Sequence, residues 1–269
     1  MPLDLSVVIT TFNSAATLGD TIESLLSLDI TESPCEIIVV DNASFDNSAI
    51  IADGYSQVNL LRCPSNLGLA RANNIGADIA SGGSILFLNP DTVILPGALH
   101  ILMKFQLNHP NAALLGPLML DSGGTIQSTA RTYPTLLDIV LRRTSLGKLP
   151  RAEKRLQKHL NPADTDKPSK VDWLVGAAMW LTPTGRERVG LMSEKYFLYF
   201  EDVQLCMRAR ERGMGVWFVP EAVIRHDGRR ASAGGSTRAL WLHLRSMVRF
   251  FSEYPCALIG KCSTDHKKD

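Results

Sequence analysis

The sequence predicts an α/β fold organised around a mostly parallel central sheet. Short apolar runs without polar alternation occur at residues 5–9, 36–40 and 85–88, and such runs are typical of strands that are buried on both faces. Segments with helical apolar spacing separate these runs, which is the pattern of a doubly wound sheet. Polar residues follow the strands at the sheet edge where open α/β folds bind their ligands.

The first half of the chain supplies the clearest elements. The first helix carries one apolar stripe, formed by Leu18, Ile22, Leu25 and Leu26. Pro96 stands at the favoured first-turn position of a later helix. The expected strands cover residues 5–9, 36–40, 58–61, 85–88 and 112–115, and the expected helices cover residues 18–26, 47–54, 68–80 and 96–108.

In the second half of the chain, the boundaries of the helices and strands are less clearly marked. Its expected elements are a hairpin-like turn at residues 119–125, a flexible loop at 161–170, a core segment at 171–181, a helix at 202–212 and a strand at 216–219. Gly213 is expected to end the helix.

Length and composition limit the classes to which the protein can belong. A chain of 269 residues suits one large α/β domain or two small ones, and its 45% hydrophobic and 20% charged residues are ordinary for a soluble globular protein. A net charge of +1 predicts no global attraction to nucleic acid. Neither a signal peptide nor a membrane-spanning run is expected. The five cysteines include no CxxC pair, so we expect them to be reduced, in a cytosol.

Two segments mix basic residues with bulky apolar ones. In residues 136–170, basic side chains cluster between Arg142 and Lys158. Such a segment suits an anionic membrane surface, and a solvated, mobile insertion explains it equally well. Residues 238–251 form a basic amphipathic helix that either packs on the domain or lies at a membrane interface. The tail from about Thr264 is polar and is expected to be disordered.

The run ILFLNPD at residues 85–91 is the central feature of the chain. Pro90 cannot donate to a sheet and disfavours a helical conformation at Asn89, so the strand ends there. Asp91 is therefore expected at the carboxyl edge of a central strand, where a carboxylate can hold Mg²⁺ or Mn²⁺ against a phosphate. The same residues are also ordinary turn formers.

Two further polar clusters are expected at this edge, at residues 11–13 and 41–42. A helix N-terminus follows each of them, and its free N–H groups and dipole favour an anion. The chain has neither GxGxxG nor a GxxxxGK motif, so a dinucleotide-binding Rossmann site or a P-loop is not supported.

Seven stretches in order resemble the family 2 glycosyltransferases, whose GT-A fold binds a nucleotide-diphospho-sugar. They are VVITTFN, EIIVVDNAS, NLGLARANNIG, ILFLNPD, VGAAM, YFEDVQLCMRARERG and the late His226. The segments VDW and YFLYFED, with the basic C-terminal helix, are similar to the rhamnosyltransferase branch, which builds bacterial surface saccharides on a lipid carrier. One departure is Asn89, where the family commonly has the first residue of Asp-x-Asp.

The resemblance implies roles for the matching residues. Asp202, or its neighbour Glu201, would be the general base of an inverting displacement. Asp91 and His226 would bind Mg²⁺ or Mn²⁺ at the leaving diphosphate. Asp41 would accept the imide N–H of uracil or thymine. The other expected nucleotide contacts are Thr11, Asn13, Asn66, Gly68, Arg71 and Asn74, and the expected acceptor contacts are Trp173, Gly176 and Ala177.

Structural alternatives exist for these roles. Asp41 can cap a helix, and Glu201 and Asp202 can stabilise a helix start through its dipole. Trp173 can belong to the core, and Asn74 can be an ordinary helix surface residue. Arg71 can contact Asp41 instead of a phosphate, and a lone histidine is often structural.

The resemblance predicts an inverting transferase that moves a sugar, L-rhamnose from dTDP-rhamnose, to a lipid-diphosphate-linked saccharide. We expect a nucleotide-sugar-binding half at residues 1–110, an acceptor-binding and catalytic half at 111–235 and an amphipathic helix with a tail at 236–269. The protein is expected to be cytoplasmic and peripheral, on the anionic inner face of a bacterial membrane. The alternatives are a UDP-sugar-dependent transferase of the same fold and a non-catalytic sugar-nucleotide or glycan-binding module.

Overall fold

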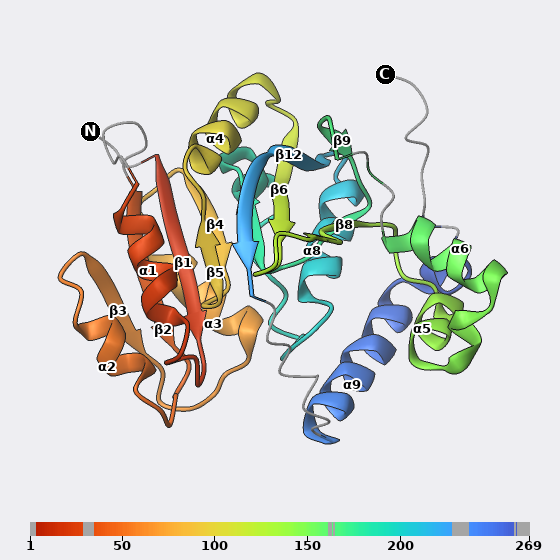
Figure 1. Ribbon diagram of the computed structural model, residues 1–269, viewed down its shortest axis with the longest axis horizontal. Helices are drawn as coiled ribbons and strands as arrows, with labels where there is room; N and C mark the ends of the chain where they lie inside the picture. Colours follow the sequence, from red (N-terminus) through yellow and green to blue (C-terminus); the bar gives the residue numbers. More distant parts are fainter. Residues whose placement is uncertain are drawn as a thin grey trace.

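The computed structural model describes residues 4–28, 35–160, 163, 165–227, 237–260 and 262. Their main sheet has the order β3-β2-β1-β4-β11-β6-β12-β5, with β7 beside β6 and β9 beside β12, while β8 and β10 form a separate pair (Figure 1). The strands are β1 Leu5–Thr11, β2 Cys35–Asp41, β3 Val58–Arg62, β4 Ser84–Leu88, β5 Thr92–Ile94, β6 Ala112–Leu120, β7 Ile126–Gln127, β8 Ala130–Arg131, β9 Ser169–Lys170, β10 Trp173–Leu174, β11 Ala178–Leu181 and β12 Gly215–His226.

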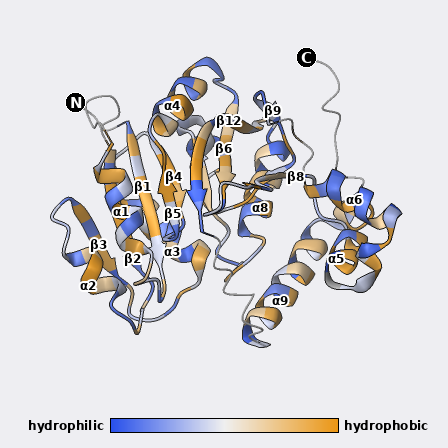
Figure 2. Cartoon of the chain, in the orientation of Figure 1, coloured by the Kyte–Doolittle hydropathy of each residue, from blue (hydrophilic) through white to orange (hydrophobic). Residues whose placement is uncertain are grey.

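Helices cover both faces of the sheet, which explains the apolar strands. Val8 of β1 packs in one core with residues of α3 and α8, whereas its neighbours Val7 and Ile9 pack in a second core with α1 and α4. The central strands are accordingly hydrophobic along their length (Figure 2). The helical segments are α1 Leu18–Leu26, α2 Ser48–Asp53, α3 Leu69–Ile79, α4 Ala98–Asn108, α5 Leu136–Arg143, η1 Ser145–Lys148, α6 Pro150–Leu160, α7 Pro183–Arg188, α8 Glu201–Glu211, α9 Thr237–Glu253 and η3 Pro255–Ile259.

Strands β1 to β4 are parallel, as predicted. Their register places Thr11 beside Asp41 and Ile9 beside Leu88, so the polar residues after β1, β2 and β4 share one edge of the sheet. β6 and β12 are also parallel. β11 and β5 run antiparallel to their neighbours, and the sequence did not predict β5 because three residues carry no periodic signal.

Strand β5 fixes the segment directly after Asp91. Its residues pair with the last three residues of β12. On the other side, two hydroxyls of α1 accept its N–H groups: Thr92 donates to Thr21 Oγ1 at 3.2 Å, and Ile94 donates to Ser24 Oγ at 3.1 Å. Both hydroxyl residues are buried, so they satisfy backbone groups that would otherwise lie unpaired in the core.

Two predicted boundaries move in the centre of the chain. β6 continues to Leu120 and closes a hairpin with β7, so the predicted turn begins two residues later than expected. The helix expected from Pro96 begins at Ala98, because Gly97 precedes it in a left-handed conformation with φ of 82°.

Strand β12 is longer than the strand predicted at residues 216–219. Its register shifts between Val219 and Val223, and it then continues to His226. In the loop predicted at residues 161–170, Ser169–Lys170 forms β9 and pairs with β12. Residues 161, 162 and 164 lie outside the described residues.

The basic middle segment is folded into α5, η1 and α6. Thr135 and Asp138 form a capping box at the start of α5: each side chain accepts the N–H of the other residue at 3.1 Å. Arg155 of α6 donates to the same Asp138 at 2.6 Å. The alternative of a mobile insertion is therefore wrong for the helical part of this segment.

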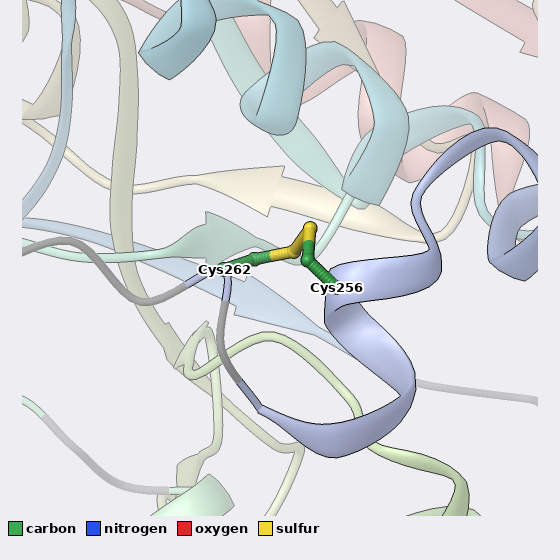
Figure 3. The surroundings of a disulfide bond; sticks show 2 residues. All are labelled: Cys256 and Cys262. Atoms are coloured by element: carbon green, nitrogen blue, oxygen red, sulfur yellow. A yellow bond between two sulfur atoms is a disulfide. The ribbon is translucent and has the colours of Figure 1, made fainter.

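The C-terminal helices pack beside the middle segment. Helix η3 contacts both α9 and α5 (Figure 1). A disulfide joins Cys256 of η3 to Cys262 (Figure 3), so the prediction that all five cysteines are reduced is wrong. The short helix brings the two Cα atoms within 5.2 Å, inside the range that a disulfide spans. The tail expected from Thr264 lies outside the described residues.

Helix α9 buries its C-terminal end, with Phe250 and Phe251 in the core, and exposes Trp241 and Val248. Within the described ranges, the structure has no helix with both the length and the apolar character needed to cross a bilayer.

We expect Thr21→Val to lower the free energy of unfolding by about 1–3 kcal/mol, because the N–H of Thr92 loses its buried acceptor while side-chain volume is conserved. Chemical denaturation followed by circular dichroism measures this change. The same substitution at Thr125, an exposed residue, is the matched control and should cost less than about 0.5 kcal/mol. Equal effects at the two positions would contradict the importance of this bond.

Candidate functional site

Asp91 and His226 meet at the carboxyl edge of the sheet. Asp91 directly precedes β5, and His226 ends β12, so the pairing of these strands brings the two side chains together. Asp91 Oδ1 lies 3.4 Å from His226 Nε2, and the N–H of Asp227 donates to the carbonyl of Asp91 at 3.0 Å. His226 was expected after a strand and is instead its last residue.

The pair fits a divalent cation. Asp91 Oδ1 is buried and has no hydrogen-bond partner, yet the side chains of Asp91 and His226 keep 18% and 14% exposure. Carboxylate oxygens and imidazole nitrogens are both common metal ligands. Among the residues that the structure describes, no three His, Cys, Asp or Glu side chains gather to hold a metal. Substrate oxygens and water would therefore complete the ligand set.

Glu201 and Asp202 lie side by side in the first turn of α8. Glu201 is buried and Asp202 is partly exposed. Asp202 Oδ2 accepts the N–H of Gly176 at 3.0 Å, and its Oδ1 accepts the N–H of Val203 at 2.8 Å. Their position suits the helix dipole, as the structural alternative requires, but the bond to Gly176 also ties Asp202 to a different element.

The pKa of each of these carboxyls is raised. Burial is the main cause for both, because it disfavours the charged form. The negative charge of Asp202 raises the pKa of Glu201 further. At Asp202 the N–H groups of Val203 and Gly176 oppose the rise, and so does the positive charge of Arg131. These groups reduce the effect of burial at Asp202, but the net shift of its pKa is still upward.

Gly176 and Ala177 connect the two acidic centres. Gly176 binds Asp202, and the carbonyl of Ala177 accepts the N–H of Asn89 at 2.8 Å, two residues before Asp91. A Cβ at Gly176 would lie 3.2 Å from the Cβ of Asp202, so glycine permits this close approach. Two predicted acceptor residues therefore lie between the predicted base and the predicted metal ligand.

The aromatic run before α8 has unusual backbone angles. Tyr199 and Phe200 both have φ of 68°, a conformation that non-glycine residues rarely adopt and that is enriched at functional sites. Helix α9 supports this turn: Ser246 Oγ donates to the carbonyl of Leu198 at 2.8 Å, and the rings of Phe250 and Phe200 lie 5.3 Å apart. The start of α8 is thus held from the C-terminal side of the chain.

The predicted base-binding residues lie at the ends of β1 and β2. Asp41 does not cap α2, and its carboxylate accepts bonds of 3.3 and 3.4 Å from the N–H of Ser44. Thr11 is fully buried, with its hydroxyl unpartnered. Asn13 is exposed in a left-handed conformation, and its Oδ1 accepts the N–H of Phe45 at 2.8 Å. Of the two side chains here that accept hydrogen bonds, that of Asp41 has the longer ones.

The loop before α3 is organised by Asn42. Its Oδ1 accepts the N–H of Leu67 at 2.8 Å, and its amide donates to Asn66 Oδ1 at 3.2 Å. Gly68, with φ of 87°, packs on the aromatic run, where an added Cβ would lie 2.5 Å from the carbonyl oxygen of Phe197. The closest neighbour of Gly68 is therefore protein backbone.

Residues Arg71 and Asn74 of α3 both contact the segment at Met192 and Glu194. Asn74 is buried, and its amide bonds both the carbonyl and the N–H of Met192, at 2.9 and 3.1 Å. These bonds tie α3 to the backbone at Met192, and the burial of Asn74 shows that the alternative of a surface position is wrong. Arg71 is exposed and lies 3.7 Å from Glu194, so the predicted pairing with Asp41 is absent.

Trp173 is a core residue. Its side chain is 6% exposed, its Nε1–H donates to the carbonyl of Thr132 at 2.7 Å, and the Arg131 guanidinium lies 5.1 Å above its ring. This packing favours the structural alternative over the predicted acceptor contact.

Sequence reasoning missed two residues at the site. Gln127 of β7 contacts His226, and Arg131 of β8 lies close enough to Asp202 to influence its pKa. Both come from two-residue strands that have no recognisable pattern. The Gly-containing turn before them was the one signal that placed a hairpin here.

The family model for Glycosyl transferase family 2 matches residues 6–166, more than half of the chain. The chain belongs to glycosyl transferase family 2. This glycosyltransferase is similar to N-acetylglucosaminyl-diphospho-decaprenol L-rhamnosyltransferase of Mycobacterium tuberculosis, with 29% identity over 246 residues that cover 85% of this chain and 78% of the relative. It is also similar to rhamnosyltransferase WbbL of Escherichia coli K12, with 25% identity over 243 residues, 87% of this chain and 88% of the relative. The predicted resemblance is confirmed.

Solved structures confirm the GT-A fold of the glycosyltransferase. GalNAc-T7, crystallised with UDP, GalNAc and Mn²⁺, has a TM-score of 0.68 at 20% identity over 93% of this chain and 48% of that protein. TarS of S. aureus, crystallised with UDP-GlcNAc, has a TM-score of 0.59 at 18% identity over 87% of this chain and 61% of that protein. The chain thus spans about half and about three fifths of these proteins, and the likeness concerns the fold.

We expect Glu201→Gln to flatten the pH dependence of stability. The pKa of Glu201 is raised to about 8, from an ordinary value near 4.3. Between these values the folded protein holds a proton that the unfolded chain has released, so this part of the stability is fully present below about pH 4 and is lost as pH rises through 8. Urea unfolding at pH 5 and pH 8 measures the difference.

The variant should be more stable than the wild type at pH 8. Glu187→Gln, at an exposed position, is the matched control and should keep the wild-type pH dependence. A wild-type slope in Glu201→Gln would show that Glu201 is ionised in the folded protein.

Proposed function

We propose that this glycosyltransferase moves L-rhamnose from dTDP-rhamnose to a lipid-diphosphate-linked saccharide and inverts the anomeric carbon. The observation that carries the proposal is the contact path from Asp202 through residues 176–177 to Asn89, beside Asp91 and His226. It brings a candidate base and a candidate leaving-group site to one sheet edge. The relative named for L-rhamnosyl transfer to N-acetylglucosaminyl-diphospho-decaprenol supports the donor sugar and the type of acceptor.

In this proposal Asp91 and His226 hold Mg²⁺ or Mn²⁺. The cation supplies charge neutralisation to the diphosphate as it leaves. The pairing of UDP with Mn²⁺ in one structure of the same fold supports a divalent ion. Asn89 offers an uncharged carbonyl, so Asp91 provides the negative charge of this site.

Asp202 acts as the general base. The acceptor hydroxyl gives its proton to the Asp202 carboxylate while its oxygen attacks the anomeric carbon and the bond to the diphosphate breaks. The N–H groups of Gly176 and Val203 fix the orientation of this carboxylate. The raised pKa of Glu201 keeps that neighbour neutral near pH 7, which limits repulsion of the Asp202 anion.

The donor nucleotide binds in the half at residues 1–110, where Asp41 accepts the imide N–H of the base. Thymine and uracil differ by one methyl group, worth about 1 kcal/mol of contact, so a UDP-sugar is the alternative donor. The acceptor binds in the half at residues 111–235.

An apolar surface near the C-terminus is proposed to bind the membrane that carries the acceptor. Many of the exposed large apolar side chains lie on α5, η1, α9, η3 and the residue after η1. These are Leu136, Leu137, Val140, Leu146, Leu149, Leu240, Trp241, Leu244, Val248, Leu258 and Ile259. Exposed basic side chains on η1, α9 and the neighbouring helix α6 suit an anionic lipid surface, and they include Lys148, Arg151, Lys154, Lys158, Arg238 and Arg245.

We expect Asp202→Asn to reduce rhamnosyl transfer about 10²- to 10⁴-fold, since it removes the base while conserving shape. Calorimetry should show wild-type binding of dTDP in the presence of Mn²⁺. The matched control is Asp78→Asn, on the exposed side of α3. Near-wild-type turnover in Asp202→Asn would exclude it as the base, and a preference for UDP over dTDP would change the donor.

In a vesicle flotation assay, we expect the wild type to rise with vesicles of anionic phospholipid. It should stay at the bottom when the vesicles are neutral. Val248→Glu should reduce flotation because it places a carboxylate in the apolar surface. The control Ile50→Glu changes an equally exposed apolar residue on α2 and should leave flotation unchanged. Failure of the wild type to bind anionic vesicles would remove the membrane surface from the proposal.

A further inference from the structure

Gln127 holds His226 with both ends of its side-chain amide. Gln127 Nε2 donates to the backbone carbonyl of His226 at 2.7 Å, and Gln127 Oε1 lies 3.0 Å from His226 Nδ1. One side chain therefore fixes both the backbone and the ring of the same residue. Gln127 belongs to β7, which pairs with β6 through Met119, so the contact is anchored in the sheet.

The bonding pattern determines which ring nitrogen carries the proton. A backbone carbonyl can only accept, so the amide NH₂ of Gln127 must face it. The amide oxygen then faces His226 Nδ1, and because this oxygen can also only accept, Nδ1 must donate. In the neutral ring the second nitrogen, Nε2, is left with a free lone pair.

The free lone pair of His226 points to Asp91. Nε2 lies 3.4 Å from Asp91 Oδ1, and this oxygen is buried without a hydrogen-bond partner. Both atoms present lone pairs at this short distance, so neither can donate a hydrogen bond to the other, and the buried oxygen is left unsatisfied. A cation bound between them relieves that cost, and the bond at Nδ1 would make the imidazole a better ligand.

We propose that Gln127 is the positioning residue of the metal site: it sets the His226 ring in the Nδ1–H tautomer and so presents Nε2 to a divalent cation beside Asp91. This inference rests on the proposed metal site at Asp91 and His226. Gln127 does not touch the cation or the sugar, and it acts through His226.

Gln127→Met tests the proposal, because methionine keeps the length of the side chain but cannot form either hydrogen bond. Nitrogen NMR of ¹⁵N-histidine-labelled protein without metal reports the His226 tautomer, with the signal assigned through His226→Gln. Electron paramagnetic resonance of free Mn²⁺, with saturating dTDP, reports the affinity for the ion. We expect loss of the pure Nδ1–H tautomer and an affinity at least about tenfold weaker.

Two further variants separate the effects. Gln127→Glu loses the donor to the His226 carbonyl but keeps an acceptor for Nδ1–H, so it should retain the tautomer, whereas Gln57→Met, on an exposed residue, should match the wild type in both readouts. Wild-type tautomer and wild-type Mn²⁺ affinity in Gln127→Met would overturn the proposal. If the wild type itself binds no Mn²⁺, the proposed metal site fails, while the tautomer measurement still decides whether Gln127 orients His226.

Discussion

The pairing of β5 with the end of β12 is the interaction on which the site depends. A strand of only three residues cannot hold its place by its own hydrogen bonds. Here β12 bonds one side of it, and Thr21 and Ser24 of α1 bond the other. The register shift after Val219 lets β12 reach this position. Without this arrangement, Asp91 and His226 would belong to unrelated parts of the sheet.

The two halves of the chain contribute different parts of the candidate site. Asp91 comes from the parallel part of the sheet, and Asp202 comes from a helix in the second half. The antiparallel strand β11 joins them, because its alignment with β4 places Ala177 against Asn89 and leaves Gly176 facing Asp202. The site therefore requires a mixed sheet. The antiparallel strand β11 brings its N-terminal end to this edge, whereas a strand parallel to β4 would bring its C-terminal end.

Long apolar runs made much of the fold predictable. Short strands such as β5 were not predicted, because three residues are too few to show a periodic pattern. Asp91 and Glu201-Asp202 could be found because each follows a strong apolar or aromatic run. Gln127 could not, since a single glutamine in a two-residue strand has no distinguishing neighbour. The partner of Asn74 within the protein could not be predicted, because an amide that suits a nucleotide equally suits a backbone, and only tertiary structure shows that this partner is Met192. The disulfide was missed because the pairing of cysteines depends on a turn.

The position of β11 has a consequence for the order of folding. β4 and β6 are close in sequence, yet β11 lies between them in the sheet. The parallel strands β1 to β4 can pair once Leu88 has been synthesised, but the free edge of β4 stays open until Ala178–Leu181 follows. Contacts between distant segments form slowly, and an open hydrophobic strand edge invites pairing with other chains. The late strand that connects the parts of the candidate site is thus also the one that covers the exposed edge of β4.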